Sequence, residues 1–427
     1  MAIDKLQTDA LSNTVTANIA SVAIGANVSI NSSTFFVGNS TANTLITAAG
    51  GFTQGANVSI NSSTFVVGSG QINATGITLP SNFGVSSNTT NLLENRNGQL
   101  FFNGRRVDLV NEYVAVYGYQ LGGFAAGAYI STADRITFST GVYAASTISN
   151  VSEARFAGSG SSDVSVYGYT NGGYNGSVVV TTCDRTTFAT SVTAAYSAGA
   201  LAAARYDHFS VSDGSVYGYV LGGYNSAFTV LSSVERRAFS TGVTAAISAT
   251  LSAVRTSRMS QSLSDGSIYG YTMGGSSTGG VAGGVTTTDR LTFSTSAIAA
   301  STASNVSVAR SDIGTVSDGA VYGYTCGGYN TGSPAAPVTT GDRTTFSTSA
   351  TAALTSANLS GVRAGLNGVS DGATYGYFSG GESTGASSYV TTTDRITFST
   401  SVLAAVTASN LPAARSFTAS AFSDGAV

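Results

Sequence analysis

The sequence contains almost no lysine or histidine. Lys5 and His208 are the single residues of those two types, so 17 of the 18 basic residues are arginine. Tryptophan is absent, and only 9% of the residues are charged, against ~25% in an average soluble protein. With a formal net charge of −3, the chain has no basic surface of the kind that binds nucleic acid.

Patterns for metals, disulfides and membrane spans are missing as well. One histidine and two cysteines, Cys183 and Cys326, are too few for a zinc site of nitrogen and sulfur ligands. Two cysteines also cannot build a disulfide framework. No apolar run reaches the ~18 residues that a membrane helix needs. We therefore expect no metal, no cofactor, no nucleic-acid partner and no insertion into a membrane.

Residues for catalysis are equally scarce. His208 stands in the run Tyr206-Asp207-His208, on a strand that we expect to lie innermost, where its ring would line a central channel. No Ser-His-Asp arrangement can be recognised around it. We predict no catalytic residue and no enzymatic activity.

A long N-terminal segment has no charge at all. Residues 11–93 lack Asp, Glu, Lys and Arg, and the block ANVSINSSTFFVG at Ala26 returns almost unchanged at Ala56. Polar and apolar residues alternate in it with the period of a strand. About 80 residues hold little core alone, so we predict a β-rich stalk over residues 24–94, wound together with other copies of the chain. A Ser/Thr-rich linker and a small independent β domain are the alternatives.

From residue 113 onward the sequence is a repeat array. Tyr-Gly-Tyr occurs six times at intervals of 50 to 53 residues, each time followed by a Gly pair, an acid–arginine pair, a Phe and a unit-ending Arg. We interpret the repeated charges as structural, with acids that accept backbone N–H groups and arginines that reach several carbonyls. The acid–arginine pairs are Asp134-Arg135, Asp184-Arg185, Glu235-Arg236, Asp289-Arg290, Asp342-Arg343 and Asp394-Arg395, and the unit-ending arginines are Arg155, Arg205, Arg255, Arg310, Arg363 and Arg415.

This order of residues resembles the kelch repeat, whose period is ~50 residues. The resemblance implies a propeller of four-stranded blades. The tryptophan of the kelch pattern is missing, and Ala-rich segments such as residues 192–195 stand in its place, which affects the expected packing between blades. The predicted fold is all-β, with the stalk, a connector hairpin at 95–112 and a six-bladed kelch-like β-propeller at 113–427.

The two ends of the array predict how the ring closes. The first unit starts at the second strand of a blade, at residues 114–120, and no first strand precedes it. Residues 416–422 form a first strand without a following unit. We expect this C-terminal strand to complete the first blade, which leaves no open sheet edge.

Length variation predicts the binding face. Between the Gly pair and the acid the spacing varies from 11 to 14 residues, while the remainder of each unit is nearly constant. Exposed variable loops are common binding sites, and aromatic rings with amides suit sugars and protein surfaces. The receptor-binding residues that we predict on these loops are Phe124, Tyr129, Tyr174, Asn175, Tyr224, Asn225, Phe228, Tyr329, Asn330 and Tyr389.

The overall plan resembles a bacteriophage tail-fibre or other virion-fibre protein. The opening MAIDKLQTDAL and the ANVSINSSTFFVGNST repeats carry this resemblance. It implies that residues 1–23 attach to other virion proteins, that the chain forms a homotrimer located in the virion, and that the head binds a host-surface glycan or protein without turnover. The alternatives are a capsid or tail decoration protein that binds another virion subunit and, less favoured, a surface-glycan hydrolase.

Overall fold

A computed structural model describes residues 115–258, 262–280, 283–332, 335–384 and 388–425, together with five short strands before them. The chain divides after residue 78 into two units. In the first unit, β1 (Gly38–Asn39) pairs with β2 (Ala42–Asn43). In the second, β3 (Leu93–Arg96), β4 (Gln99–Phe102) and β5 (Arg105–Arg106) form a sheet. The attachment segment and most of the stalk lie outside the described residues, so these domain boundaries stay predictions.

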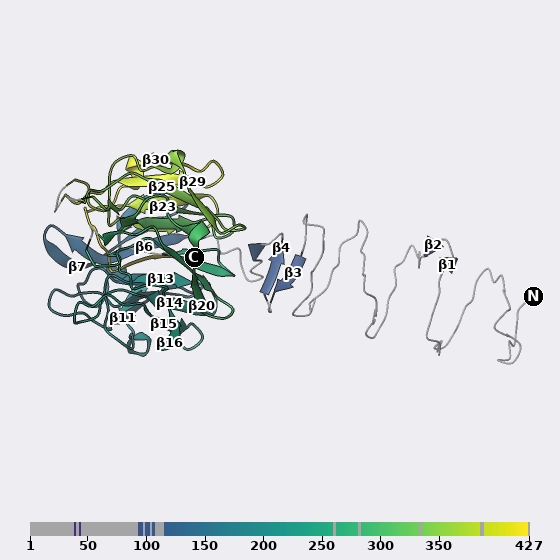
Figure 1. The fold of residues 1–427 in the computed structure, drawn as a ribbon, viewed down its shortest axis with the longest axis horizontal. Helices are drawn as coiled ribbons and strands as arrows, with labels where there is room; N and C mark the ends of the chain where they lie inside the picture. The colour runs from purple at the N-terminus through teal and green to yellow at the C-terminus, as the bar shows by residue number, and fades with distance from the viewer. Residues whose placement is uncertain are drawn as a thin grey trace, which may run out of the picture. The chain divides into compact units, whose positions relative to one another are not determined.

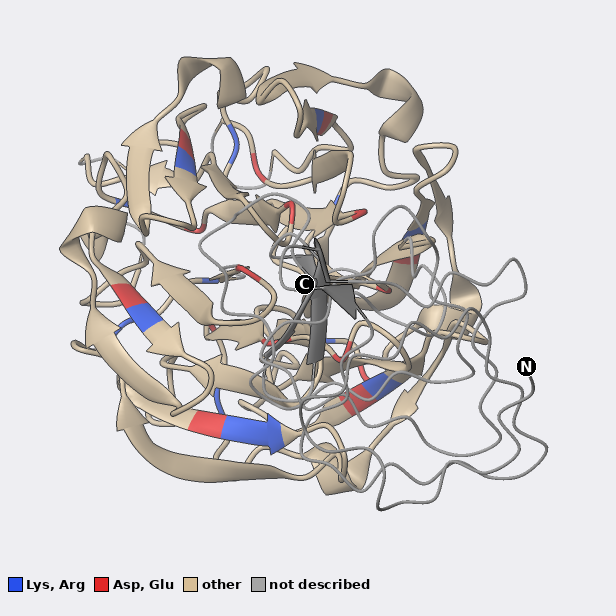
Figure 2. Cartoon of the chain, turned by 90° about the vertical axis from the view of Figure 1, so that its right-hand side faces the viewer, with Lys and Arg blue, Asp and Glu red and all other residues tan. Residues whose placement is uncertain are grey.

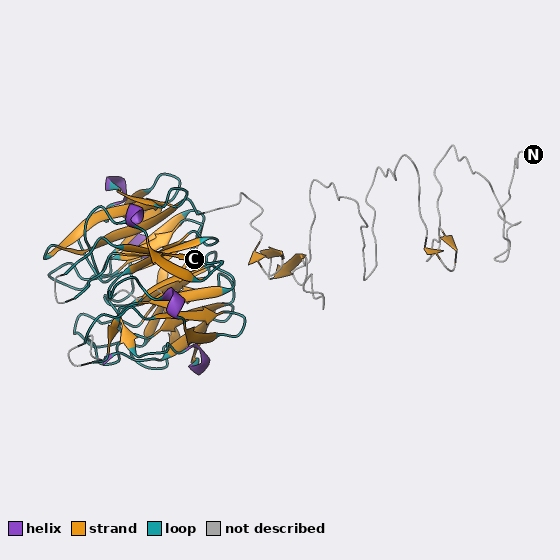
Figure 3. Ribbon diagram, turned by 90° about the horizontal axis from the view of Figure 1, so that it is seen from above, coloured by secondary structure: helices purple, strands orange, loops and turns teal. Residues whose placement is uncertain are grey.

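Residues 115–425 form a β-propeller of six four-stranded antiparallel blades around a channel (Figures 1 and 2). The all-β six-bladed fold is therefore confirmed. In each blade we name the strands a to d, from the channel outward. Helix is confined, in the described chain, to short 3₁₀ turns on the outer rim (Figure 3), of which five follow d strands: η1 (Thr147–Ser149), η2 (Ser197–Gly199), η4 (Thr302–Ser304), η5 (Thr355–Ala357) and η6 (Thr407–Ser409).

Each of the six blades contributes its four strands in the order a to d. Blade 1 holds β31 (Ser420–Ser423), β6 (Tyr117–Ala125), β7 (Ala128–Thr137) and β8 (Val142–Ala145), and blade 2 holds β9 (Ser159–Ser162), β10 (Tyr167–Asn171), β11 (Cys183–Thr187) and β12 (Val192–Ala195). Blade 3 holds β13 (Phe209–Ser212), β14 (Tyr217–Leu221), β15 (Ser233–Ala238) and β16 (Thr244–Thr250), and blade 4 holds β17 (Leu263–Ser264), β18 (Tyr269–Met273), β19 (Thr288–Thr292) and β20 (Ala297–Ala300). Blade 5 holds β22 (Gly314–Ser317), β23 (Tyr322–Cys326), β25 (Gly341–Thr345) and β26 (Ala350–Ala353), and blade 6 holds β27 (Asn367–Ser370), β28 (Tyr375–Ser379), β29 (Thr393–Thr397) and β30 (Val402–Ala405). A further pair, β21 (Arg310–Ser311) and β24 (Tyr329–Asn330), joins the loops of blade 5.

The C-terminal strand closes the ring as the repeat array predicts. Strand β31 pairs with β6, with Ser420 opposite Leu121 and Ser423 opposite Gly118. Beyond the strand, Asp424 Oδ1 accepts hydrogen bonds from the backbone N–H groups of residues 116 (2.6 Å) and 117 (2.7 Å). The first and last parts of the propeller sequence thus share one blade.

The a strands begin later than the sequence indicates. In blade 3 we expected the strand from Tyr206, but β13 starts at Phe209. The reason is Asp207, whose φ of 52° lies in the left-handed region and interrupts the extended backbone. Tyr206 instead forms an isolated bridge with Tyr224 in the b–c loop.

Tyrosine and phenylalanine fill the contacts between blades in place of the missing tryptophan. The second Tyr of each Tyr-Gly-Tyr packs against the Phe of the next blade; Tyr119 and Phe188, for example, have ring centroids 6.0 Å apart. Such aromatic pairs contribute ~0.5–1.5 kcal/mol beyond the area they bury. At the same contact Tyr119 shares a hydrogen bond of 2.8 Å with Ser191. The equivalent ring pairs are Tyr169–Phe239, Tyr219–Phe293, Tyr271–Phe346, Tyr324–Phe398 and Tyr377–Phe138.

Each unit-ending arginine is buried and pairs with the acid of strand c in its own blade. In blade 3, Arg205 lies 2.8 Å from Glu235, and its Nη1 donates to the carbonyls of Gly222 (3.1 Å) and Ser233 (3.1 Å). Those two carbonyls stand at the two ends of the b–c loop, so one guanidinium holds both ends. The other pairs are Arg155–Asp184, Arg255–Asp289, Arg310–Asp342, Arg363–Asp394 and Arg415–Asp134.

The arginine that follows each acid has a different position. Arg135 lies over the ring of Tyr117, with 4.0 Å between the guanidinium carbon and the ring centroid. This is the geometry of a cation–π contact. The same contact recurs at Arg185, Arg236, Arg290, Arg343 and Arg395.

The Gly pairs mark the points where neighbouring blades approach most closely. Gly222 and Gly223 have φ of 63° and 89°. A Cβ on Gly222 would lie 2.5 Å from the carbonyl oxygen of Arg255, which is closer than real atoms come. Both predicted reasons for glycine, a positive φ and a close backbone approach, are confirmed here.

Candidate functional site

The two ends of the propeller differ in what they offer a ligand. At one end, the short a–b and c–d turns surround the channel. At the other end lie the b–c loops and the d–a connections. We describe the two as the turn end and the loop end.

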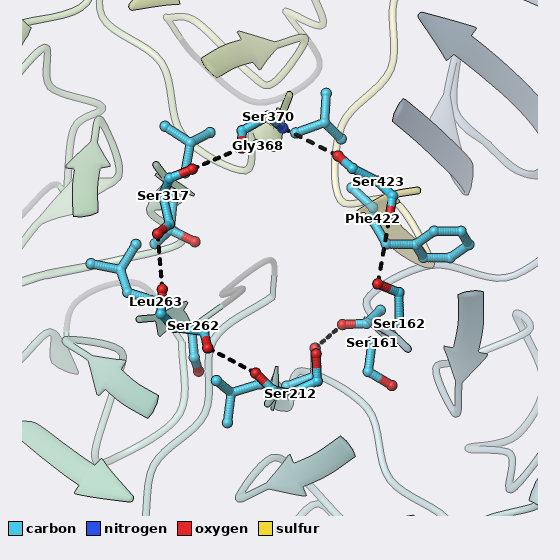
Figure 4. Close-up of a pocket in the computed structure, with 18 residues that line it drawn as sticks. Ser161, Ser162, Ser212, Ser262, Leu263, Ser317, Gly368, Ser370, Phe422 and Ser423 are labelled. Carbon is cyan, nitrogen blue, oxygen red and sulfur yellow. Dashed lines mark hydrogen bonds between the residues drawn. The ribbon is translucent and has the colours of Figure 1, made fainter. Parts of the chain in front are cut away.

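The channel is narrow, and serine dominates its wall (Figure 4). Its cavity volume is about 70 Å³. The last serine of each a strand donates to a neighbouring blade, as Ser264 does to the carbonyl of Ser212 (2.8 Å) and Ser317 to that of Ser264 (2.8 Å). No titratable side chain is among the residues that line this part of the structure. The channel is therefore a structural seam with little chemistry of its own.

The loop end holds a larger cavity of about 460 Å³, within the usual range for small-ligand sites. Both the b–c loops and the d–a connections contribute to it. Its lining consists of Phe124, Tyr129, Phe156, Tyr206, Asp207, Tyr224, Arg258, Gly280, Glu382, Tyr389 and Phe417. We call this cavity the loop-end pocket.

One wall of the loop-end pocket is aromatic. Phe124 and Tyr129 face each other across the β6–β7 hairpin with centroids 5.2 Å apart, and Tyr389 of blade 6 lies 5.7 Å from Phe124. On blade 3, Tyr206 and Tyr224 stack at 5.2 Å. Tyr174 connects the two groups, since its ring lies 5.9 Å from Tyr129 and 5.9 Å from Tyr206. The wall therefore continues over blades 6, 1, 2 and 3.

A ring of hydrogen bonds between blades carries part of the pocket. The second residue after each unit-ending Arg contributes to it: Asp207 N–H donates to the carbonyl of Ala157 (2.7 Å), and Gly365 N–H donates to that of Asp312 (2.9 Å). Between them, Asp312 N–H donates to Ser257 Oγ (3.0 Å). Asp207 and Phe417 belong to this ring and also line the pocket, so their side chains are held by backbone that joins neighbouring blades.

The opposite side of the pocket is charged. We call Asp207, Arg258, Asp312 and Glu382 the polar corner. Asp312 Oδ1 accepts the backbone N–H of Arg258 (2.9 Å), and Glu382 Oε2 accepts the hydroxyl of Tyr329 (2.8 Å). The guanidinium of Arg258 lies 5.3 Å from the ring centroid of Phe417.

Burial changes the protonation of this corner. It raises the pKa of Asp207 to about 8, against which the positive charge of Arg258 acts only in part. Burial also raises the pKa of Asp312. The carboxyl of Asp207 is therefore largely neutral at neutral pH and can donate a hydrogen bond.

The structure separates the predicted receptor-binding residues into three groups. Phe124, Tyr129, Tyr224 and Tyr389 line the pocket, while Tyr174 and Tyr329 adjoin it. Phe228 is 62% exposed at the edge of the same aromatic cluster. The three asparagines support their own loops, because the side-chain oxygens of Asn175, Asn225 and Asn330 accept backbone N–H groups two to six residues later.

Sequence reasoning missed the residues that come from the d–a connections: Phe156, Tyr206, Asp207, Arg258 and Phe417. Length variation pointed to the b–c loops alone. A usable indication was present in the sequence, because the positions directly after each unit-ending Arg change from unit to unit while their surroundings repeat.

His208 lies away from both cavities. Its side chain is fully buried and does not line the channel, contrary to our expectation. Burial, with a smaller effect of Arg205, lowers the pKa of His208 to about 3. The ring is thus a neutral part of the contact between blades 2 and 3.

Metal and membrane features are absent from the described portion of the chain. There, no three side chains of His, Cys, Asp or Glu come together in a metal-binding arrangement. No helix in the same portion is long and apolar enough to span a membrane.

Neither a protein-family model nor a curated protein matches this sequence. Among solved structures, the chain is similar to the structure of YjhT, with a TM-score of 0.53 and 12% identical residues. The match covers 67% of this chain and 97% of that one. An identity this low shows the propeller fold alone.

Proposed function

We propose that this chain is a bacteriophage virion-fibre protein whose kelch-like propeller head binds a host-surface glycan through the loop-end pocket. The observation that carries the proposal is the composition of that pocket. An aromatic wall faces a polar corner across a cavity of about 460 Å³. Sugars have an apolar face that stacks on aromatic rings and an edge of hydroxyl groups that needs hydrogen-bond partners.

The test is binding of the full-length chain to an array of bacterial surface glycans. Tyr129→Ala and Tyr224→Ala each remove a ring from the aromatic wall, and we expect each to weaken binding at least about tenfold, the equivalent of 1.4 kcal/mol. Val178→Ala is the matched control, because Val178 is 57% exposed on a b–c loop but does not line the pocket. Full binding by both tyrosine variants would refute the pocket as the site.

Attachment to another virion subunit is the second candidate function. Exposed aliphatic residues at the turn end favour it, since apolar surface patches often mark protein contacts. These residues are Val116, Val142, Val166, Val192, Val216, Val243, Ile268, Val321 and Val402. Binding to purified phage particles that lack the chain, together with no binding to any glycan, would favour this role.

We propose binding without turnover, so that a bound glycan is recovered unchanged. The discriminating measurement is chromatography of a bound oligosaccharide after prolonged incubation with the chain. Release of shorter products would instead support the hydrolase alternative, with Asp207 and Glu382, the two carboxyl groups that line the pocket, as the residues to test.

A further inference from the structure

The charges that break the repeat pattern collect in one place. Within the propeller, four acids and two arginines fall outside the repeated positions: Glu153, Asp207, Asp312, Glu382, Arg237 and Arg258. Three of these acids and one of these arginines make up the polar corner. A scaffold role explains a charge that recurs in every blade, but it does not explain charges that occur once and meet at a cavity.

Arg258 brings hydrogen-bond donors to the pocket. Its backbone N–H bonds to Asp312, and its guanidinium lies over Phe417. In the part of the chain that the structure describes, no ion pair engages this guanidinium, unlike the six unit-ending arginines. The planar group thus keeps N–H donors that a ligand can use.

Asp207 supplies a second polar group beside it. Its side chain lines the pocket and is only 5% exposed, and its Oδ1 has no hydrogen-bond partner among the residues described. A buried polar atom without a partner is costly. A ligand hydroxyl at this position would satisfy it.

The charges of the corner are close to balanced, which bears on the kind of ligand. Arg258 is positive, and the carboxyl groups of Asp312 and Glu382 face it together with the hydroxyl of Tyr329. A ligand carboxylate would meet these carboxyl groups, and a ligand ammonium would meet Arg258. Moving either extra charge out of water into the pocket is unfavourable without its own partner.

We propose that the polar corner selects an uncharged saccharide unit, with Arg258 and Asp207 as the specificity-determining residues that hydrogen-bond its hydroxyl edge. The inference rests on the proposed function, since it names the ligand class of the same pocket. Sugar hydroxyls both donate and accept, so they match a corner that has free donors and an unpaired carboxyl oxygen. The aromatic wall then contacts the apolar face of the ring.

The experiment uses the full-length chain and five probes: the methyl glycosides of glucose, galactose, mannose, glucuronic acid and glucosamine. Saturation-transfer NMR ranks the probes, and titration calorimetry measures the affinity of the best. We expect a neutral glycoside to bind at least tenfold more tightly than both charged ones. Tighter binding of the glucuronide or the glucosaminide would overturn the inference and leave glycan binding in place.

Two pairs of variants test the residues. Arg258→Lys keeps the charge but replaces the planar group, and we expect at least a tenfold loss for the neutral glycoside. Asp207→Asn keeps a donor and an acceptor and should retain binding, whereas Asp207→Leu should lose it. Glu153→Gln is the control on the loop end outside the pocket, and thermal melting checks that each variant is folded.

The outcomes separate the two proposals. Wild-type affinity in both Arg258→Lys and Asp207→Leu, with binding lost in Tyr224→Ala, would reject the polar corner and keep the pocket. No binding of any of the five probes by the wild-type chain would reject both.

Discussion

Asp207 combines a strained backbone with a buried acid. Its φ of 52° places it in a region that Asp tolerates better than most residues, and its N–H joins blade 3 to blade 2. Arg258, Asp312, Tyr206 and Tyr224 are the titratable groups that face its carboxyl. One residue thus serves both the contact between blades and the pocket.

The raised pKa of Asp207 predicts that the propeller becomes less stable as pH rises. The unfolded chain releases this proton near pH ~4, whereas the folded chain keeps it to about 8. The free energy of unfolding therefore falls between those two values and levels off above the second. Urea unfolding at pH 6.5 and pH 9 measures the fall, and we expect Asp207→Asn to reduce it by about 1–2 kcal/mol.

A wild-type and variant pair is necessary because other groups contribute. Burial also raises the pKa of the Cys183 and Cys326 thiols, which lowers stability at high pH in the wild type and the variant alike. The same fall in both proteins would show that Asp207 does not hold its proton in the folded state.

At the scale of strands and blades, the six contacts between blades are not equivalent. Four of them have a serine at the left-handed position of the c–d turn, and its hydroxyl bonds to the second Tyr of the neighbouring blade: Ser191, Ser296, Ser349 and Ser401. The other two have Gly141 and Gly242 there, with φ of 68° and 71°. These contacts lack that hydrogen bond.

We predict that Gly141→Ser stabilises the propeller and Gly242→Ser destabilises it. A Cβ at Gly141 would lie 3.3 Å from the hydroxyl oxygen of Tyr377, which leaves room for the missing hydrogen bond. A Cβ at Gly242 would lie 2.2 Å from that of Tyr196 and would clash. Denaturant unfolding should show a gain of about 1 kcal/mol for the first variant and a loss for the second. Equal effects of the two variants would contradict the prediction.

Strand β31 predicts a second effect at this scale. Phe422 is buried against Tyr119, with ring centroids 5.7 Å apart, and against Phe188 at 6.1 Å. We expect Phe422→Ala to lower the free energy of unfolding by about 3–5 kcal/mol and Phe422→Leu to cost clearly less, because Leu fills most of the space.

Removal of residues 416–427 should have a larger consequence. It leaves β6 with an unpaired edge and prevents ring closure. Size-exclusion chromatography should then show aggregates in place of a single species. A monodisperse, protease-resistant truncated protein would show that the ring does not depend on this strand.

The sequence predicted what recurs, and it missed what occurs once. Six copies of Tyr-Gly-Tyr indicated the blade number, and the incomplete units at the two ends predicted the closing strand. Asp207 and Arg258 are 51 positions apart in different units, and only the ring brings them to one cavity. The start of the a strands was also misjudged, because a left-handed residue is not visible in an alternating pattern.

For the whole molecule, the distribution of charge separates the propeller from the residues before it. In the propeller, most arginines are fixed in buried ion pairs or over tyrosine rings. Residues 11–93 have no charge to keep a lone chain soluble. This contrast is the basis for proposing that several copies assemble through the N-terminal segment.

We predict a homotrimer for the full-length chain. Light scattering should give three times the 42.8 kDa of one chain. Replacing Val28 and Phe35, on the predicted apolar face of the segment, by Asp should reduce the measured mass, while the same change at the polar neighbour Ser29 should not. A mass of 42.8 kDa for the unmodified chain would reject the assembly.

The buried arginine at the base of each blade bears on how such a head can change over generations. In blade 3 the guanidinium of Arg205 bonds to the last carbonyl before the b–c loop and the first one after it, and Arg255 does the same in blade 4 with Gly274 and Thr287. Mutations and insertions between those anchor points leave the core intact. A phage with this protein can therefore acquire new host specificity through loop mutations without first losing a folded fibre, and the same design suits the head as a scaffold for randomised loop libraries.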